Sequence, residues 1–302
     1  MKACVILNPY SNRWRARERR PEMEAALKSA GINYELVEME GAGDGVAKAM
    51  QAVRAGFSPI IAAGGDGGIS EVVNGLYRAS PNAVLGPLGL MPLGTANDLV
   101  VNLGLPRDLN AMARIIAAGK TRRIDLGKVT LGEGEAEWVF DNNSAIGLEP
   151  VVTVHNVRIK RIKGTLRYLV AALQAIGEGP HWQAKLQWDG GHYEGRVTLV
   201  SVGNCPLTGG LFRMAPAADP ADGKLTFVFA YAASRLKMLS LLPRTISGDF
   251  VNDPAVQQHH TQRLVIELES DSPIQIDGEL RTLAVKKVSY EALAGRLDVL
   301  SL

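Results

Sequence analysis

The sequence contains few cysteines, no long apolar run and little net charge, and each of these absences excludes a class of protein. Its two cysteines, Cys4 and Cys205, lie far apart and outside any C-x-x-C or His-rich pattern. This spacing excludes a disulfide framework, argues against a zinc site and suits a reducing cytosol. No window approaches the roughly 18 uninterrupted apolar residues of a membrane span, and a net charge of +2 gives no overall reason to bind nucleic acid. We therefore expect a cytoplasmic protein that binds no nucleic acid and touches the inner face of the membrane only peripherally.

Glycine, in contrast, is concentrated around one aspartate in the stretch Gly64-Gly65-Asp66-Gly67-Gly68. The apolar run 59–63 precedes it, and apolar residues at helical spacing follow it, which predicts a strand, a tight turn and a helix N-terminus. Free N–H groups at such a helix start bind phosphate. The charge of Asp66 would repel a bare phosphate, so we expect a bridging metal ion or a hydroxyl group beside it. A simpler interpretation is a tight turn with a solvated aspartate; the pattern is neither G-x-G-x-x-G nor a P-loop.

A second polar loop, residues 94–98, follows the apolar segment 83–93. Loops at the carboxyl ends of strands gather at one edge of an open α/β sheet, so this loop should lie beside the first. Its polar side chains can also cap a helix, and both interpretations can hold. Alternating strand and helix patterns up to about Gly119 predict a mostly parallel, doubly wound sheet.

From Ile124 onward the pattern changes to strands that alternate apolar and polar residues, which predicts an antiparallel sandwich. The expected strands cover residues 138–140, 182–188, 192–202, 224–230 and 264–268, and the expected helices lie near 164–176 and 235–246. An exposed strand edge there could pair across a homodimer. Two basic runs, within residues 13–20 and 158–167, are interpreted either as patches for nucleotide phosphates or lipid headgroups, or as solvated helix faces.

Four ordered motifs together resemble the diacylglycerol kinase catalytic-domain family, in particular the soluble bacterial lipid kinases of the YegS type. They are Asn8-Pro9, the glycine stretch 64–68 with Glu71, the loop 92–98, and Asp277-Gly278-Glu279. The resemblance implies a Rossmann-like, NAD-kinase-like nucleotide domain, residues 1–123 with a returning segment 285–302. It also implies a β-sandwich lipid-substrate domain, residues 124–284, with the active site in the cleft between the two domains. The implied reaction transfers the γ-phosphoryl group of ATP to a lipid hydroxyl with Mg²⁺.

The resemblance also implies roles for individual residues. Glu279 would accept the proton of the lipid hydroxyl, and Asp66 would be a second catalytic residue. The implied nucleotide-binding residues are Asn8, Gly64, Gly65, Asp66, Gly67, Gly68, Glu71, Thr95 and Asn97. Asp98 and Asp125, with Asp66, would hold Mg²⁺ through water, while Asp219 and Asp222 would belong to a second, structural metal site. Without the resemblance, Asp277-Gly278-Glu279 is an ordinary hairpin turn.

Two departures from the family pattern leave other functions open. Gly68 stands where the family usually has threonine, and Asn12 stands where it usually has glycine, although asparagine tolerates a left-handed turn. The alternatives are an NAD kinase, which shares the Gly-Gly-Asp-Gly core, and a catalytically weak lipid- or nucleotide-binding homologue. The lipid acceptor also stays open among diacylglycerol, a phosphatidyl lipid, a sphingoid and a polyprenol.

Overall fold

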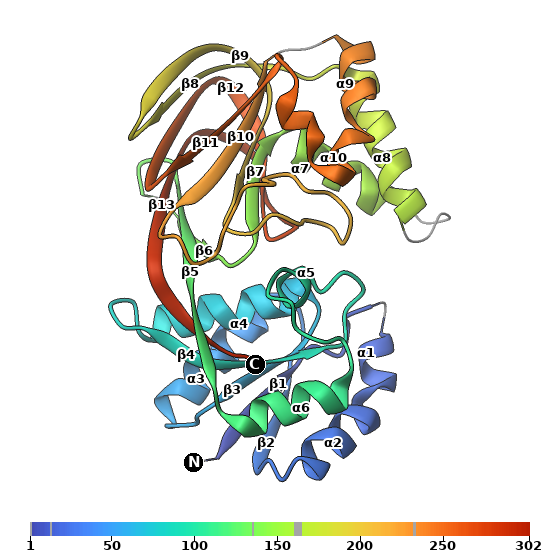
Figure 1. Ribbon diagram of the computed structural model, residues 1–302, viewed down its shortest axis with the longest axis vertical. Coiled ribbons are helices and arrows are strands. Elements are labelled where there is room, and N and C mark those ends of the chain that lie inside the picture. The colour runs from blue at the N-terminus through green and yellow to red at the C-terminus, as the bar shows by residue number, and fades with distance from the viewer. Residues whose placement is uncertain (1, 13, 135, 160–164, 232–233) are drawn as a thin grey trace. The chain divides into compact units, whose positions relative to one another are not determined.

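The computed structural model describes residues 2–12, 14–134, 136–159, 165–231 and 234–302 (Figure 1). The chain divides into two compact units: unit 1 comprises Met1–Leu126 with Leu293–Leu302, and unit 2 comprises Gly127–Ala292. Our sequence-based boundaries were residues 123 and 285. Two long strands, β5 (Thr121–Leu131) and β13 (Glu279–Leu300), run through both units and pair with one another.

Unit 1 is built on a parallel sheet whose strands follow the order β13-β4-β3-β1-β2. The strands not yet defined are β1 (Ala3–Leu7), β2 (Tyr34–Glu38), β3 (Ile60–Gly64) and β4 (Leu85–Pro92). β1 and β3 are buried along their whole length. Continuous apolar runs of this kind are typical of strands covered on both faces, and short runs of Ile, Val, Leu and Ala suit them.

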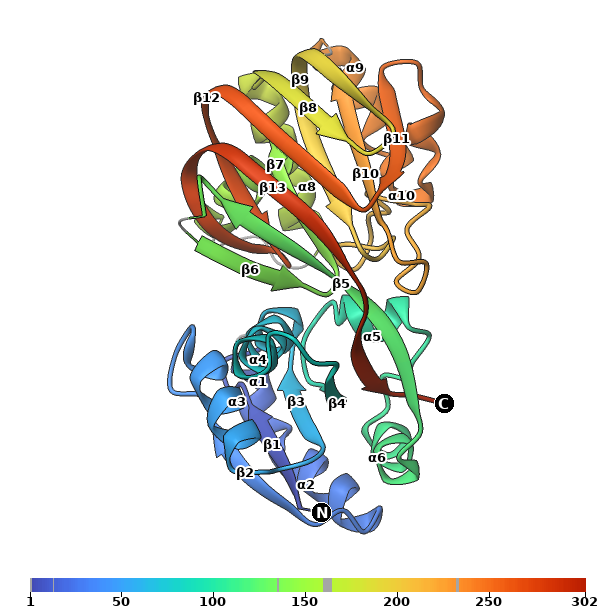
Figure 2. The same cartoon turned by 90° about the vertical axis from the view of Figure 1, so that its left-hand side faces the viewer.

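Helices cover both faces of this sheet, as the doubly wound prediction requires. They are α1 (Arg15–Glu18), α2 (Arg20–Ser29), α3 (Asp44–Arg54), α4 (Asp66–Ala79), α5 (Asp98–Asn102) and α6 (Leu109–Ala118). α3 packs on α4, and α2 packs on α6; Figure 2 shows α3 and α4 on one side of β1 and β3, and α6 on the other. The predicted doubly wound sheet is therefore confirmed.

The strand register brings three loops to one edge of the sheet. Leu7 pairs with Ala63, and Ala63 pairs with Met91, so β1, β3 and β4 end level with one another. The chain leaves these strands at Asn8, at Gly65 and at Leu93. The sequence motifs on these loops are therefore neighbours in space, as we expected.

Unit 2 is an antiparallel sandwich, which confirms the second part of the fold prediction. Its remaining strands are β6 (Ala136–Phe140), β7 (Asn143–Gly147), β8 (Trp182–Trp188), β9 (Gly191–Gly203), β10 (Leu225–Tyr231), β11 (Val256–Thr261) and β12 (Arg263–Ile276). β9 pairs with β8 over its first half and with β7 and β10 over its second half, so the sheet folds over on itself. Apolar side chains from both layers, including Phe140, Phe227 and Phe229, fill the interior.

Short helices gather on one side of the sandwich (Figure 1). They are α7 (Leu148–Arg158), α8 (Thr165–Glu178), α9 (Arg235–Leu241), α10 (Arg244–Ser247) and the 3-10 turn η1 (Asp249–Asn252). The sequence patterns predicted α8 and the α9–α10 segment but missed α7. In the part of the chain that the structure describes, no helix is both long enough and apolar enough to span a bilayer.

Candidate functional site

The glycine stretch after β3 turns directly into α4. Gly64 ends the strand, Gly65 is the N-cap of the helix, and the first turn contains Gly67 and Gly68. Amides in a first turn have no partner within the helix, so those of Gly67 and Gly68 are available to an anion. The positive end of the helix dipole adds to this preference. The local structure is thus the strand, tight turn and helix start that the sequence predicted.

The loop after β4 is fastened to this turn through backbone atoms. The carbonyl oxygen of Gly64 accepts hydrogen bonds from the amides of Leu93, at 2.9 Å, and Gly94, at 3.0 Å. A Cβ atom on Gly94 would lie 2.4 Å from the Cα atom of Gly65, and one on Gly65 would lie 3.1 Å from the Cα atom of Gly94. Only glycine at position 94 allows so close a backbone approach.

The Asp66 carboxylate holds the two loops together. Its oxygens accept hydrogen bonds from the amides of Asn97, at 2.9 Å, and Asp98, at 2.5 Å, at the start of α5. Burial raises the pKa of Asp66, while these backbone N–H groups act in the opposite sense. We expected a metal ion or a hydroxyl group as its partner; the partners in the structure are backbone amides. These are the contacts of a positioning residue.

The loop after β1 lies against the other two loops. We call these three segments, residues 8–12, 64–68 and 93–98, the cradle. Ser11 Oγ accepts a hydrogen bond from the amide of Gly65 at 3.1 Å, and Thr95 Oγ1 donates to Asn12 Oδ1 at 3.0 Å. Asn12 adopts a φ of 53°, so the prediction of a left-handed turn at this asparagine is confirmed. Ser11 was not among the predicted site residues, although it belongs to the same motif.

Asn8 occupies the space next to Gly68. A Cβ atom on Gly68 would lie 3.1 Å from the Cβ atom and 3.2 Å from Nδ2 of Asn8. A threonine, the usual residue of the family here, therefore requires Asn8 to shift. The packing of Asn8 against Gly68 leaves little room for a larger side chain. Gly68→Thr would therefore disturb Asn8 as well as add the hydroxyl group.

Glu71 and Asn97 act within the fold rather than at its surface. Both carboxylate oxygens of Glu71 accept hydrogen bonds at 2.8 Å, from the amides of Gly43 and Gly45, and so cap α3. Asn97 is buried with a φ of 51°, and its Oδ1 atom accepts a hydrogen bond from the amide of Gly94 at 3.1 Å. The nucleotide-binding roles of Glu71 and Asn97 stay predictions. The hydrogen bonds show that Glu71 holds the start of α3 and that Asn97 holds the loop at Gly94.

The carboxylates predicted to hold Mg²⁺ are not grouped as a ready-made metal site. Among the described residues, no three His, Cys, Asp or Glu side chains lie close enough together to hold a metal ion. Asp98 and Asp125 are buried, and Asp125 accepts a hydrogen bond from the amide of Gly295 at 2.6 Å. Mg²⁺ usually takes only one or two carboxylates and completes its shell with water and substrate phosphates. The side chains fit such a shared site, not one built from protein alone.

The predicted second metal loop is a pair of tight turns. Asp219 Oδ1 accepts from the amide of Ala221 at 3.0 Å, and Asp222 Oδ1 accepts from the amide of Lys224 at 2.9 Å. Both aspartates are exposed. Such side chain-to-backbone bonds are those of ordinary Asx turns. A metal role for Asp219 and Asp222 therefore stays a prediction.

In unit 2, Asp277 and Gly278 form the two-residue turn between β12 and β13. Ile276 pairs with Glu279, and the turn residues have φ values of 48° and 78°, as a tight hairpin requires. The buried Asp277 carboxylate accepts hydrogen bonds from the amides of Asn142, at 3.1 Å, and Asn143, at 3.2 Å. Glu279 is exposed at the exit of the turn. Asp277 therefore fixes the turn, and Glu279 is the carboxylate left at its surface.

The two basic runs are partly neutralised. Arg19 pairs with Glu22 at 2.9 Å, and Arg20 pairs with Glu24 at 2.8 Å and also with Glu38. These pairs match the solvated-face interpretation for that part of the first run, whereas Arg15 and Arg17 stay exposed. Arg13 of the first run, and Lys160, Arg161 and Lys163 of the second, lie outside the described residues.

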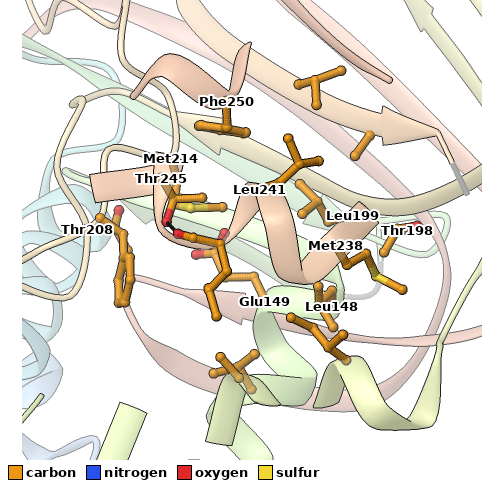
Figure 3. Close-up of a pocket in the computed structure, with 17 residues that line it drawn as sticks. Leu148, Glu149, Thr198, Leu199, Thr208, Met214, Met238, Leu241, Thr245 and Phe250 are labelled. Carbon is orange, nitrogen blue, oxygen red and sulfur yellow. Dashed lines mark hydrogen bonds between the residues drawn. The ribbon is translucent and has the colours of Figure 1, made fainter. Parts of the chain in front are cut away.

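Unit 2 contains an apolar pocket whose lining residues could not be assigned from the sequence (Figure 3). Its cavity volume is about 110 Å³. Helices α7 to α10 supply much of its wall, with Val152, Ala172, Met238 and Leu241 among the lining residues. Of the described residues that line it, only Glu149 is charged. No linear motif could have indicated the pocket, because its walls come from segments up to about 100 residues apart and carry ordinary core residues.

Family comparisons agree with this two-unit organisation. The diacylglycerol kinase catalytic domain matches residues 2–129, and the YegS C-terminal NAD kinase beta sandwich-like domain matches residues 143–301. A diacylglycerol kinase of Staphylococcus carnosus is 24% identical over 92% of this chain and 88% of its own length. One from Staphylococcus aureus is 25% identical over 92% of this chain and 86% of its own length.

Solved structures show the same fold. A crystal structure of a diacylglycerol kinase from Bacillus anthracis superposes with a TM-score of 0.78 at 22% identity, covering 100% of this chain and 97% of that one. Yeast NADH kinase in complex with NADH gives a TM-score of 0.56 at 10% identity, covering 100% of this chain and 84% of that one. At these identities the likeness concerns the fold alone.

Proposed function

This chain belongs to the diacylglycerol kinase catalytic-domain family, and on that premise we propose that it is an ATP- and Mg²⁺-dependent lipid kinase. The proposed reaction transfers the γ-phosphoryl group of ATP to the hydroxyl of a diacylglycerol-like lipid. The observation that carries the proposal is the cradle in unit 1. There the first-turn amides of α4 have no partner within the helix, and Gly65 and Gly94 meet backbone to backbone. Such a surface suits a chain of phosphates, because glycine backbone forms it and the helix start offers amides to an anion.

The residues around the cradle have distinct proposed roles. The amides of Gly67 and Gly68 bind phosphate oxygens, and Asp66 keeps the β4–α5 loop in place for this purpose. Thr95, which is exposed on that loop, contacts the nucleotide. Asp98 and Asp125 hold Mg²⁺ together with the phosphates of ATP. The ion, when bound, neutralises charge that develops on the transferred phosphoryl group.

Glu279 is the proposed proton acceptor for the lipid hydroxyl. It is exposed on a turn whose backbone geometry Asp277 fixes through the amides of Asn142 and Asn143. A general base needs hydrogen-bond reach to the hydroxyl it deprotonates, and a fixed turn supports this. The pocket in the same unit supports a lipid acceptor, because its predominantly apolar wall is complementary to an acyl chain.

An NAD kinase is the rival function, and the apolar lining of the pocket argues against it. NAD is polar and charged, whereas the wall is built mainly from Leu, Val, Ala, Met and Phe side chains. The acceptor lipid lies in a bilayer, so the protein must contact a membrane surface peripherally. Oligomeric state has no bearing on these arguments.

The experiment is transfer of labelled γ-phosphate from ATP, with Mg²⁺, to a mixed lipid extract and to NAD in parallel. The proposal predicts a labelled, chloroform-soluble product, whose mass gives the acceptor lipid. Label in NADP would replace this function by that of an NAD kinase. If ATP binds but no label moves, the protein is a weak lipid- or nucleotide-binding homologue.

A further inference from the structure

The pocket of unit 2 contains a buried carboxyl group, Glu149, that no cation among the described residues neutralises. Oε1 of Glu149 accepts hydrogen bonds from Asn143 Nδ2 and from Gln275 Nε2, both at 2.9 Å. Oε2 is buried and makes no hydrogen bond of standard geometry, and the hydroxyl of Ser201 lies near the carboxyl group. The other 16 lining residues are uncharged. A buried polar atom without a well-formed hydrogen bond costs stability, so its retention indicates a use.

The surroundings of Glu149 favour its neutral, hydrogen-bond-donating form. Burial raises the pKa of Glu149, while the amides of Asn143 and Gln275 and the hydroxyl of Ser201 act in the opposite sense. In the protonated group, Oε1 is a carbonyl oxygen that accepts the hydrogen bonds of both side-chain amides, and Oε2–H is a donor that makes no hydrogen bond of standard geometry within the fold. A donor in an apolar pocket is complementary to an uncharged acceptor such as an ester carbonyl.

Hydrogen bonds also connect this carboxyl group to the turn that bears Glu279. Gln275 donates from Nε2 to Glu149, and its Oε1 atom accepts from the amide of Gly278 at 2.7 Å. One amide side chain thus joins the pocket carboxyl to the Asp277-Gly278-Glu279 turn. In a diacylglycerol, the free hydroxyl is only a few bonds from the ester carbonyls. A lipid held by its carbonyl at Glu149 would therefore present its hydroxyl toward that turn.

We propose that Glu149 Oε2 hydrogen-bonds an ester carbonyl of an uncharged acylglycerol whose chain fills the pocket, and so selects the lipid class and orients its hydroxyl. The inference rests on the proposed lipid kinase function. Glu149 is then a specificity-determining residue. A sphingoid lipid, whose ammonium group would require an ionised Glu149, is the competing ligand.

The test compares equilibrium binding of dioctanoylglycerol with that of its dioctyl ether, which lacks the carbonyl groups, in the absence of ATP. The wild type should bind the ester about five- to tenfold more tightly, the effect of one neutral hydrogen bond. Glu149→Gln keeps a donor and should keep most of this ratio, whereas Glu149→Leu should reduce it to near one. Met238→Leu, a matched control in the same pocket, should change both affinities together and leave the ratio unchanged.

Other outcomes overturn the inference. If the wild type binds ester and ether equally well, no hydrogen bond to the ester carbonyl exists. This result does not depend on whether any variant folds. Loss of the ratio in Glu149→Gln, with sphingosine bound more tightly than the ester, shows that a carboxylate serves an ammonium group. A protein that keeps the ratio but transfers no phosphate refutes the kinase function alone. One that phosphorylates ether and ester equally well refutes the Glu149 inference alone.

A second observation concerns the outer surface of the helices that wall the pocket. Six of the 13 exposed large apolar side chains in the described part of the chain lie on α7 to α10: Val157, Leu169, Leu173, Leu236, Leu239 and Ile246. Leu236 is 79% exposed and Val157 is 72% exposed. α8 packs on α7 and on α9, and α9 packs on α10, so these helices form one layer (Figure 1). A helix layer with apolar residues on both its inner and outer sides differs from an ordinary amphipathic surface.

The charge of this layer favours an anionic surface. The helices carry the cations Arg158, Arg167, Arg235, Lys237 and Arg244 against two carboxylates, Glu149 in the pocket and Glu178. Asp253 beside the layer bonds both Lys237 and Arg244 and orients them. Cations around exposed leucines are typical of helices that lie at the headgroup boundary of a membrane.

We propose that the outer side of α7 to α10 docks on an anionic lipid bilayer, which brings the pocket wall to the lipid. The test is sedimentation with vesicles of phosphatidylcholine containing phosphatidylglycerol, and with phosphatidylcholine alone. Binding should require the anionic lipid and weaken with salt. Leu236→Glu should weaken it about tenfold or more, because a leucine leaves the apolar boundary, whereas Leu302→Glu, an equally exposed control in unit 1, should not. Equal loss in both variants, or none, overturns the proposal, and unchanged unfolding temperatures verify that both fold.

Discussion

Replacement of Asp66 by asparagine tests whether this carboxylate positions the nucleotide loops or acts on a ligand directly. Both of its oxygens accept backbone N–H groups, from Asn97 at 2.9 Å and from Asp98 at 2.5 Å. An asparagine offers one acceptor and turns an NH₂ group toward the other amide, so one charge-assisted bond is lost and two donors face each other. From the usual cost of such changes, Asp66→Asn should lower the free energy of unfolding by about 2–4 kcal/mol.

The assay is thermal unfolding combined with binding of a non-hydrolysable ATP analogue. A loss of this size lowers the unfolding temperature of a chain of this length by roughly 3–8 °C, and nucleotide affinity should fall with it because the two loops separate. Asp108→Asn is the matched control: Asp108 caps α6 through the amide of Ala111 at 2.8 Å. Asparagine caps helices equally well, so its effect should stay below about 0.5 kcal/mol. An Asp66→Asn protein that unfolds at the wild-type temperature but has lost activity would refute the positioning role.

Three further predictions concern the cradle, the pocket and a buried thiol. Gly94→Ala should lower the free energy of unfolding by about 1–3 kcal/mol in urea titrations, because its methyl group overlaps backbone, whereas Gly41→Ala, with open space around it, should be neutral. Ala172→Phe should raise the KM for dioctanoylglycerol about tenfold or more by filling the pocket, and Leu173→Phe, on the outer side of the same helix, should not. Burial raises the pKa of the Cys4 thiol to about 11, so iodoacetamide should alkylate it at pH 8 only after unfolding. The raised pKa means that the folded protein disfavours the Cys4 thiolate. Cys4 should therefore contribute to the free energy of unfolding below pH 8.5, and this contribution should be lost as the pH rises toward 11. The pH dependence of unfolding in Cys4→Ala, which has no thiol at this position, gives the reference.

The sequence was sufficient to predict the doubly wound sheet, the sandwich and the meeting of the two glycine loops. These features follow from local rules: short apolar strands, glycine turns and the convergence of strand ends in a parallel sheet. The left-handed conformation of Asn12 was predictable for the same reason, since few residues tolerate it. Helix α7 was missed because its apolar residues do not fall on one face, so no amphipathic period marks it.

Partnerships between distant residues could not be predicted. The backbone partners of Asp66, 31 and 32 residues away, are not visible in a motif, so its positioning contacts could not be predicted. Glu71 caps a helix 26 to 28 residues earlier in the chain. Glu149 carries no recognisable pattern, and its importance follows only from the pocket and from Gln275, 126 residues later. Such contacts depend on tertiary packing, which sequence periodicity does not report.

The most direct test of the central claim is phosphoryl transfer to dioctanoylglycerol by the wild type and by Glu279→Gln, with binding of an ATP analogue measured on both. The account predicts that the wild type transfers labelled phosphate from ATP to the lipid. The variant should lose at least about 100-fold in kcat while its affinity for the analogue changes by less than about twofold, because removal of a base affects the transition state only. A variant that keeps more than about a tenth of the wild-type rate, or a wild type that labels no lipid, would contradict the account.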